Sequence, residues 1–173
     1  KSPHITLLLI VGAILISASH SHAQNFDFRR LQKQVQDFSV IIDMDIDISF
    51  GMQSTTEKDR YLGTIVTSDG LVIFNGTALD VAGSLATLSG FNVKTSPKKI
   101  VIKTMPGKQY TGEYIGVDRY TNIGFIRIVN PTKEKFTPAS FAGNYSPRIG
   151  SWVALYMLLP DFITPPLMAD IGM

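Results

Sequence analysis

Three aspartates, Asp43, Asp45 and Asp47, alternate with apolar residues between Val40 and Phe50. A period of two is typical of a half-buried strand, so the carboxylates would project from one face at a spacing of about 6.6–6.8 Å. A hard cation such as Ca²⁺ prefers oxygen ligands, but calcium loops need ligands that converge from a turn. Two acids could also serve a glycosidase, yet nothing in the sequence singles out such a pair. We therefore predict a solvated strand face, whose like charges discourage edge-to-edge strand pairing, and no metal or cofactor.

Histidine and cysteine chemistry is confined to the start of the chain. All three histidines lie within the first 22 residues, and the sequence has no cysteine. Those residues follow a signal-peptide pattern: Lys1 precedes a 12-residue apolar run from Ile5 to Ile16, and Ser21-His22-Ala23 supplies the small residues for cleavage after Ala23. Such a run is too short to span a bilayer, so we predict a signal peptide over 1–23 and no stable membrane anchor after cleavage. The mature chain, secreted or periplasmic, would then lack His-dependent and Cys-dependent catalysis and zinc sites.

Charge is nearly balanced along the chain. The sequence has 16 Lys and Arg against 14 Asp and Glu, a formal net charge of +2, with both signs scattered. This balance does not favour a nucleic-acid partner. Because disulfides are excluded, stability must come from packing, which a domain of about 150 residues can supply.

Hydrophobic periodicity predicts a short helix followed by strands. Apolar residues recur at spacings of three and four up to Phe38, which is typical of an amphipathic helix, placed over residues 24–39. Six or seven short strands follow, and together they indicate an all-β barrel or sandwich. The predicted strands are Val40–Phe50, Tyr61–Thr67, Leu71–Asn75, Lys99–Thr104, Gln109–Val117, Ile123–Val129 and Ile149–Leu155.

Turn-forming residues lie between several of these strands. Asp69-Gly70 and Pro106-Gly107 each predict a hairpin between their flanking strands. Residues 76–96 are rich in small side chains and are compatible with a short helix or an irregular loop. The Pro-containing connection over residues 130–137 is the best candidate for a boundary between two subdomains.

Trp152 lies on an apolar strand, where a buried core aromatic is expected.

Three stretches carry motifs in a recognisable order: residues 63–79 (GTIVTSDGLVIFNGTAL), 114–128 (YIGVDRYTNIGFIRI) and 149–155 (IGSWVAL). Together they resemble the trypsin-like serine proteases of the Deg/HtrA type. The first is similar to the hairpin that leads into the catalytic histidine, the second to the strand-turn-strand that carries the aspartate, and the third to the strand that opens the second barrel. The resemblance implies a double β-barrel, with a complete first barrel over 40–130 and a second barrel only begun over 131–173.

The same resemblance places substitutions at both catalytic positions that can be aligned. The histidine position falls on Thr77 and the aspartate position on Asn122, while the serine would lie beyond Met173. A serine hydroxyl needs a base near pKa 7 that can return the proton to the leaving group, and threonine cannot act as one. The mature chain has no histidine with which a shifted alignment could replace it.

The expected function is therefore that of an exported, catalytically inactive protease homologue that binds a protein or peptide. Two alternatives remain. One is an active serine endopeptidase of the same type whose catalytic groups lie outside this sequence. The other is a structural or adhesive β domain stabilised by calcium. The ligand's identity and the oligomeric state stay open.

Overall fold

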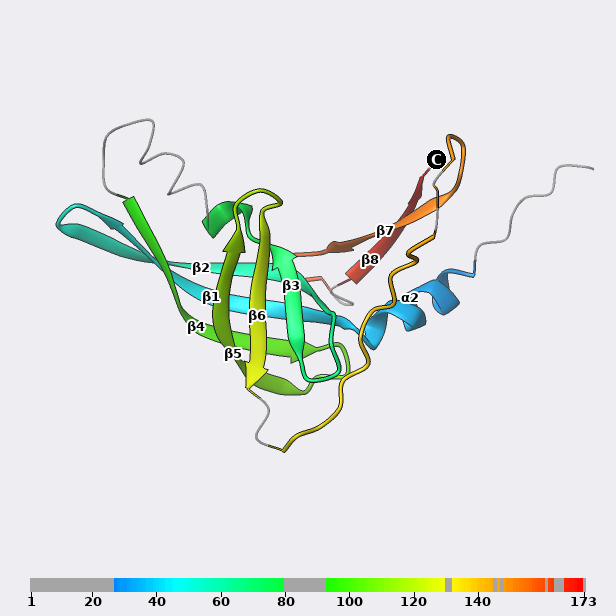
Figure 1. Ribbon diagram of the computed structural model, residues 1–173, viewed down its shortest axis with the longest axis horizontal. Coiled ribbons are helices and arrows are strands. Elements are labelled where there is room, and N and C mark those ends of the chain that lie inside the picture. Colours follow the sequence, from blue (N-terminus) through cyan, green and yellow to red (C-terminus); the bar gives the residue numbers. More distant parts are fainter. Residues whose placement is uncertain are drawn as a thin grey trace, which may run out of the picture.

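The computed structural model describes residues 27–79, 93–129, 132–144, 146, 148–160, 162–163 and 167–172 (Figure 1). The predicted signal peptide over residues 1–23 lies outside these residues. Helix α2 spans Phe28–Gln36 and is therefore shorter than the predicted 24–39. The Asp27 carboxylate accepts a hydrogen bond from the Arg30 amide at 3.0 Å, which satisfies a backbone donor at the start of the helix. Among the described residues, no helix is long and apolar enough to cross a membrane.

Six antiparallel strands close into a barrel in the order β1-β2-β3-β6-β5-β4 (Figure 1). This confirms the predicted mostly-β fold with a closed barrel and a short N-terminal helix. The pairs β1-β2, β2-β3, β4-β5 and β5-β6 are each joined by a short turn, whereas β3 pairs with the distant β6 and β1 closes the barrel against β4. The strands are β1 (Ser39–Phe50), β2 (Gln53–Ile65), β3 (Leu71–Asn75), β4 (Val93–Thr104), β5 (Gln109–Asp118) and β6 (Ile123–Val129).

The core fills the barrel with alternate residues of each strand. On β1 the apolar members Val40, Ile42 and Met44 are at most 1% exposed, whereas the aspartates between and after them are half-buried. The predicted period of two is therefore confirmed. Gly63 lets β2 cross this core closely, because a Cβ there would lie 2.7 Å from both Ile42 Cδ1 and Val72 Cγ1. The cluster comprises Val40, Ile42, Met44, Ile46, Ile65, Val72, Phe74, Leu79, Ile100, Ile102, Ile126 and Ile128.

Strands β2 and β4 begin earlier than their sequence pattern indicates, at Gln53 and Val93. β2 pairs with β1 along its length but with β3 at only three positions, and β4 likewise pairs with β5 at three. β1 thus lies between β2 and β4 and is not an edge strand. The expectation that its aspartates protect an edge is wrong, since both sides of β1 are hydrogen-bonded to neighbours.

The segment after β6 returns along the barrel. The Phe136 amide donates to the Ser68 carbonyl at 3.0 Å, and the Ala139 amide donates to the Ile65 carbonyl at 2.8 Å. The Phe136 ring packs edge-on against Tyr110, with 5.4 Å between ring centroids. Residues 132–139, which include part of the predicted subdomain boundary, therefore pack on the barrel.

Strands β7 (Val153–Leu158) and β8 (Leu167–Gly172) form a separate two-stranded antiparallel sheet (Figure 1). The predicted strand over Ile149–Leu155 is thus displaced toward the C-terminus. Trp152 precedes β7 and is 45% exposed, so the expected buried core position is wrong. That this sheet begins a second barrel stays a prediction.

Candidate functional site

A pocket of about 460 Å³ brings Thr77 and Asn122 together at one end of the barrel. It lies where the end of β3 meets the turn between β5 and β6. We call it the neutral pocket and define it by its lining residues, which are Leu62, Thr64, Ile73, Phe74, Asn75, Thr77, Thr121, Asn122 and Ile123. The two positions that the resemblance aligned with the catalytic histidine and aspartate therefore share one site.

Thr77 is held by the side chain of Asn75. The Asn75 Oδ1 accepts hydrogen bonds from the Thr77 amide at 3.0 Å and from the Thr77 hydroxyl at 2.6 Å. An asparagine side chain commonly accepts a hydrogen bond from the backbone two residues later and so stabilises a turn. Residues 77–79 continue as a helical turn, so the small-residue stretch over 76–96 begins helically. Residues 80–92 of it lie outside the described residues, and its end belongs to β4.

Asn122 lies in the left-handed region, with φ +56°. Asparagine adopts this conformation more readily than most residues, so the residue type suits the tight turn. The Asn122 amide donates to the Asp118 carbonyl at 2.7 Å, and the Asn122 carbonyl accepts from the Gly76 amide at 2.8 Å. That last bond ties the Asn122 turn to the turn that carries Thr77.

Gly76 allows the two turns to approach each other. A Cβ on Gly76 would lie 2.7 Å from Val117 Cγ2 and 3.1 Å from the Gly124 backbone nitrogen. Only a residue without a side chain fits there, and this explains the Asn75-Gly76 pair next to Thr77.

Asp118 stabilises the turn from outside the neutral pocket. Its carboxylate accepts from the Thr121 hydroxyl at 2.7 Å and from the Tyr120 amide at 3.1 Å. These hydrogen bonds hold the pKa of Asp118 below its ordinary value. The carboxylate nearest in sequence to Asn122 is thus engaged in shaping the turn.

None of the residues that line the neutral pocket has a side chain that titrates near neutral pH. The site can donate and accept hydrogen bonds through its hydroxyls and amides, and it offers apolar surface from Leu62, Phe74 and Ile123. The described lining residues supply no general base. Sequence reasoning missed Leu62, Thr64 and Thr121. Their signal was weak, because the outward face of β2 becomes part of a site only once β3 and β6 lie beside it.

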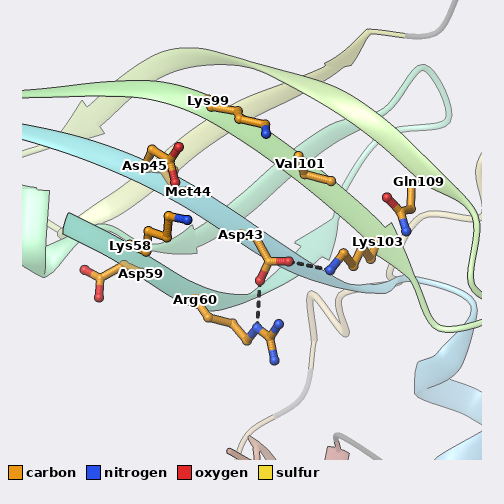
Figure 2. A pocket seen from close by; sticks show the side chains of 10 residues that line it. All are labelled: Asp43, Met44, Asp45, Lys58, Asp59, Arg60, Lys99, Val101, Lys103 and Gln109. Carbon is orange, nitrogen blue, oxygen red and sulfur yellow. Dashed lines mark hydrogen bonds and ion pairs between the residues drawn. The ribbon is translucent and has the colours of Figure 1, made fainter. Parts of the chain in front are cut away.

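The predicted aspartate row lies on the outer face of the barrel, and two of its members, Asp43 and Asp45, line a second cavity of about 400 Å³ (Figure 2). We call this cavity the charged pocket. Strand β1 supplies its centre, and β2 and β4 supply its two sides. The lining residues are Asp43, Met44, Asp45, Lys58, Asp59, Arg60, Lys99, Val101, Lys103 and Gln109.

Cationic side chains on the neighbouring strands pair with two of the three aspartates in this row. Asp43 forms ion pairs of 2.7 Å with Arg60 Nε and with Lys103 Nζ (Figure 2). Asp47 accepts from the Thr56 hydroxyl at 2.6 Å and lies 3.8 Å from Lys98 Nζ. Within the described ranges, no group of three or more acidic, histidine or cysteine side chains could hold a metal ion.

The pKa of Asp43 reflects two opposing influences. Partial burial raises it, but the hydrogen bonds and charges of Arg60 and Lys103 outweigh burial and leave the pKa below its ordinary value of 3.8. A carboxyl whose pKa is lower in the folded state stabilises that state above the unfolded-state pKa. The contribution is lost as the pH falls through the folded-state pKa.

We expect Asp43→Asn to lower the free energy of unfolding by about 1 kcal/mol at pH 7, because solvent screens this half-exposed cluster. The difference from wild type should shrink as the pH falls below 3.8. Urea unfolding of both proteins at pH 7 and at acidic pH measures this difference in the free energy of unfolding. Asp45→Asn is the matched control on the same face, because no ion pair joins Asp45 to a described residue. An equal loss in both variants, or a difference that does not depend on pH, would contradict the prediction.

Comparison with protein-family models and with curated proteins gives no match to this sequence. The closed six-stranded antiparallel barrel is consistent with one barrel of the trypsin-like fold.

Proposed function

We propose that this chain is an exported, catalytically inactive homologue of the trypsin-like serine proteases and that it binds a protein or peptide at the neutral pocket. One observation carries the proposal. Thr77 and Asn122, the positions aligned with the family's histidine and aspartate, line the same pocket, and none of its described lining residues has an ionisable side chain.

The chemistry of the pocket supports binding over hydrolysis. In the family's triad, changing the aspartate to asparagine alone costs about 10⁴ in turnover. Here the imidazole is replaced as well, and the Thr77 hydroxyl is already committed to Asn75 at 2.6 Å. Threonine can neither accept the nucleophile's proton at neutral pH nor return it to the leaving amine.

The lining of the neutral pocket also suits a peptide. Apolar side chains from β2, β3 and β6 can cover an uncharged side chain, and the threonine and asparagine groups can hydrogen-bond a peptide backbone. The volume of about 460 Å³ falls within the range of small-ligand sites. The absence of charge in the lining favours apolar or hydroxyl-bearing peptide side chains.

Reduced, carboxymethylated casein tests both halves of the proposal. The purified protein should not hydrolyse fluorescently labelled casein above the rate in buffer, and it should bind the labelled casein in a fluorescence anisotropy titration. Thr64→Trp fills the neutral pocket from its outward face and should weaken binding by at least about fivefold, or about 1 kcal/mol.

Thr111→Trp is the matched control, because Thr111 is an exposed threonine of β5 outside the neutral pocket. Thermal unfolding of both variants verifies that they fold. Equal binding by both variants would overturn the assignment of the pocket. Hydrolysis of casein above the rate in buffer would instead favour the active serine endopeptidase.

A further inference from the structure

Charges on the outer face of the β2-β1-β4 sheet form three columns. The aspartates of β1 lie in the middle, Lys58 and Arg60 of β2 lie on one side, and Lys99 and Lys103 of β4 lie on the other (Figure 2). The strand register places Asp43 opposite Arg60 and Asp45 opposite Lys58. Residues directly opposite on an antiparallel pair share a face, so this arrangement follows from the backbone.

A β-bulge adds a cation to this face. The register between β1 and β4 shifts between Met44 and Ile46, so that Met44 pairs with Ile100 and Ile46 with Pro97. Two consecutive lysines then oppose Asp45. Lys98 approaches Asp47 and Lys99 lines the charged pocket, so both extend over the aspartate face. Bulges re-aim side chains in this way, and they often occur near functional sites.

The charged pocket has an excess of positive charge. Its lining contains four cationic side chains and three carboxylates. Arg60 and Lys103 both form ion pairs with the Asp43 carboxylate. Asp59 accepts a hydrogen bond from the Tyr61 hydroxyl at 2.9 Å. In the part of the chain that the structure describes, Lys58 and Lys99 have no ion-pair partner, and they flank the cavity on opposite strands.

We propose that the charged pocket binds a multiply charged oxyanion, a phosphate or sulfate group, between Lys58 and Lys99. Lys103 supplies a third cation at the same cavity, and its ammonium points toward Asp43 at the centre (Figure 2). The volume of about 400 Å³ leaves room for the anion and several waters, each of which occupies about 30 Å³. The site is separate from the neutral pocket, and the two share none of the described lining residues.

Sodium phosphate and sodium sulfate, titrated at constant ionic strength against sodium chloride, test this site by nuclear magnetic resonance. Saturable shifts are expected at the backbone amides of Lys58, Asp45 and Lys99. Lys99→Gln and Lys58→Gln should each weaken binding by at least about fivefold, the effect of a pair of unit charges at about 4 Å in water. Asp45→Asn should tighten binding, because it removes a carboxylate beside the anion.

Lys94→Gln is the control for a general loss of charge, because Lys94 is exposed on the same strand β4 but lies outside the charged pocket. Shifts that fail to saturate, or an equal loss with Lys94→Gln, would overturn the proposal. Glycerol 1-phosphate identifies the source of the group. Binding at least as tight as that of inorganic phosphate assigns the site to a phosphate ester, and weaker binding assigns it to the free anion.

Discussion

Replacing Ile102 with alanine is expected to lower the free energy of unfolding by about 2–5 kcal/mol. Ile102 is fully buried on β4. It pairs with Ile42 on β1 and with Tyr110 on β5, so it lies at the β1–β4 pairing that closes the barrel. Truncation removes apolar contacts and leaves a cavity that the closed sheet can fill only in part. Because small domains are stable by only about 5–15 kcal/mol, the change should be large in a urea unfolding curve.

Ile115→Ala is the matched control for this prediction. Ile115 is the same residue type on the neighbouring strand β5 but is 54% exposed. Its truncation should change stability by about 0.5 kcal/mol or less. If Ile102→Ala cost no more than Ile115→Ala, the barrel interior would not be a packed core, and the closed architecture would have to be reconsidered.

Gly124→Ala is expected to destabilise the protein by about 1–3 kcal/mol through overpacking. A Cβ on Gly124 would overlap the Phe74 ring, which is 5% exposed and packs against Tyr61 with 5.2 Å between ring centroids. The ring also lines the neutral pocket, so a displaced ring would narrow that pocket. The measurement is the midpoint of urea unfolding, followed by the anisotropy titration with casein, in which binding should weaken.

A double-mutant cycle gives this second prediction its internal control. Phe74→Leu alone loses packing, but in the Gly124→Ala background it also removes the overlap. The double variant should therefore be more stable than the sum of the single changes predicts, with a coupling of about 0.5–3 kcal/mol. Additive effects would show that Gly124 and Phe74 do not meet in the folded protein.

The strands and turns of the barrel were predictable where local chemistry specifies them. The alternation on β1 marked its buried face, and the aspartates lie on the other. Gly70 and Gly107, each the second member of a predicted turn pair, have φ +95° and +97°. Glycine adopts these values without a steric cost, so both hairpins could be predicted from two residues each.

The full lengths of β2 and β4 could not be predicted in the same way. The first seven residues of β2, from Gln53 to Asp59, are all exposed and show no apolar alternation. They form a strand because β1 offers them a complete ladder of hydrogen-bond partners. The displaced strand β7 and the exposed Trp152 show the same limit, since an apolar stretch alone does not specify what packs against it.

The two candidate sites could be predicted from the sequence to different degrees. Thr77 and Asn122 were singled out through the family resemblance, and the fold brings them together by the hydrogen bond from Gly76 to Asn122. Asp43 was visible as an acidic residue on a strand. Its partners Arg60 and Lys103 were not, because only the strand register places them beside it.

By itself, the sequence determined the β class, the principal turns, the buried side of β1, and the confinement of histidine to the first 22 residues. These properties depend on residue type, on a period of two, or on glycine's conformational range, which are all local. The tertiary structure alone decided the strand order, the bulge that turns Lys98 and Lys99 to one face, and the grouping of side chains into a neutral and a charged pocket. Alternation specifies the face on which a side chain lies, but its neighbours across the sheet follow from hydrogen-bond register between strands that are distant in the chain.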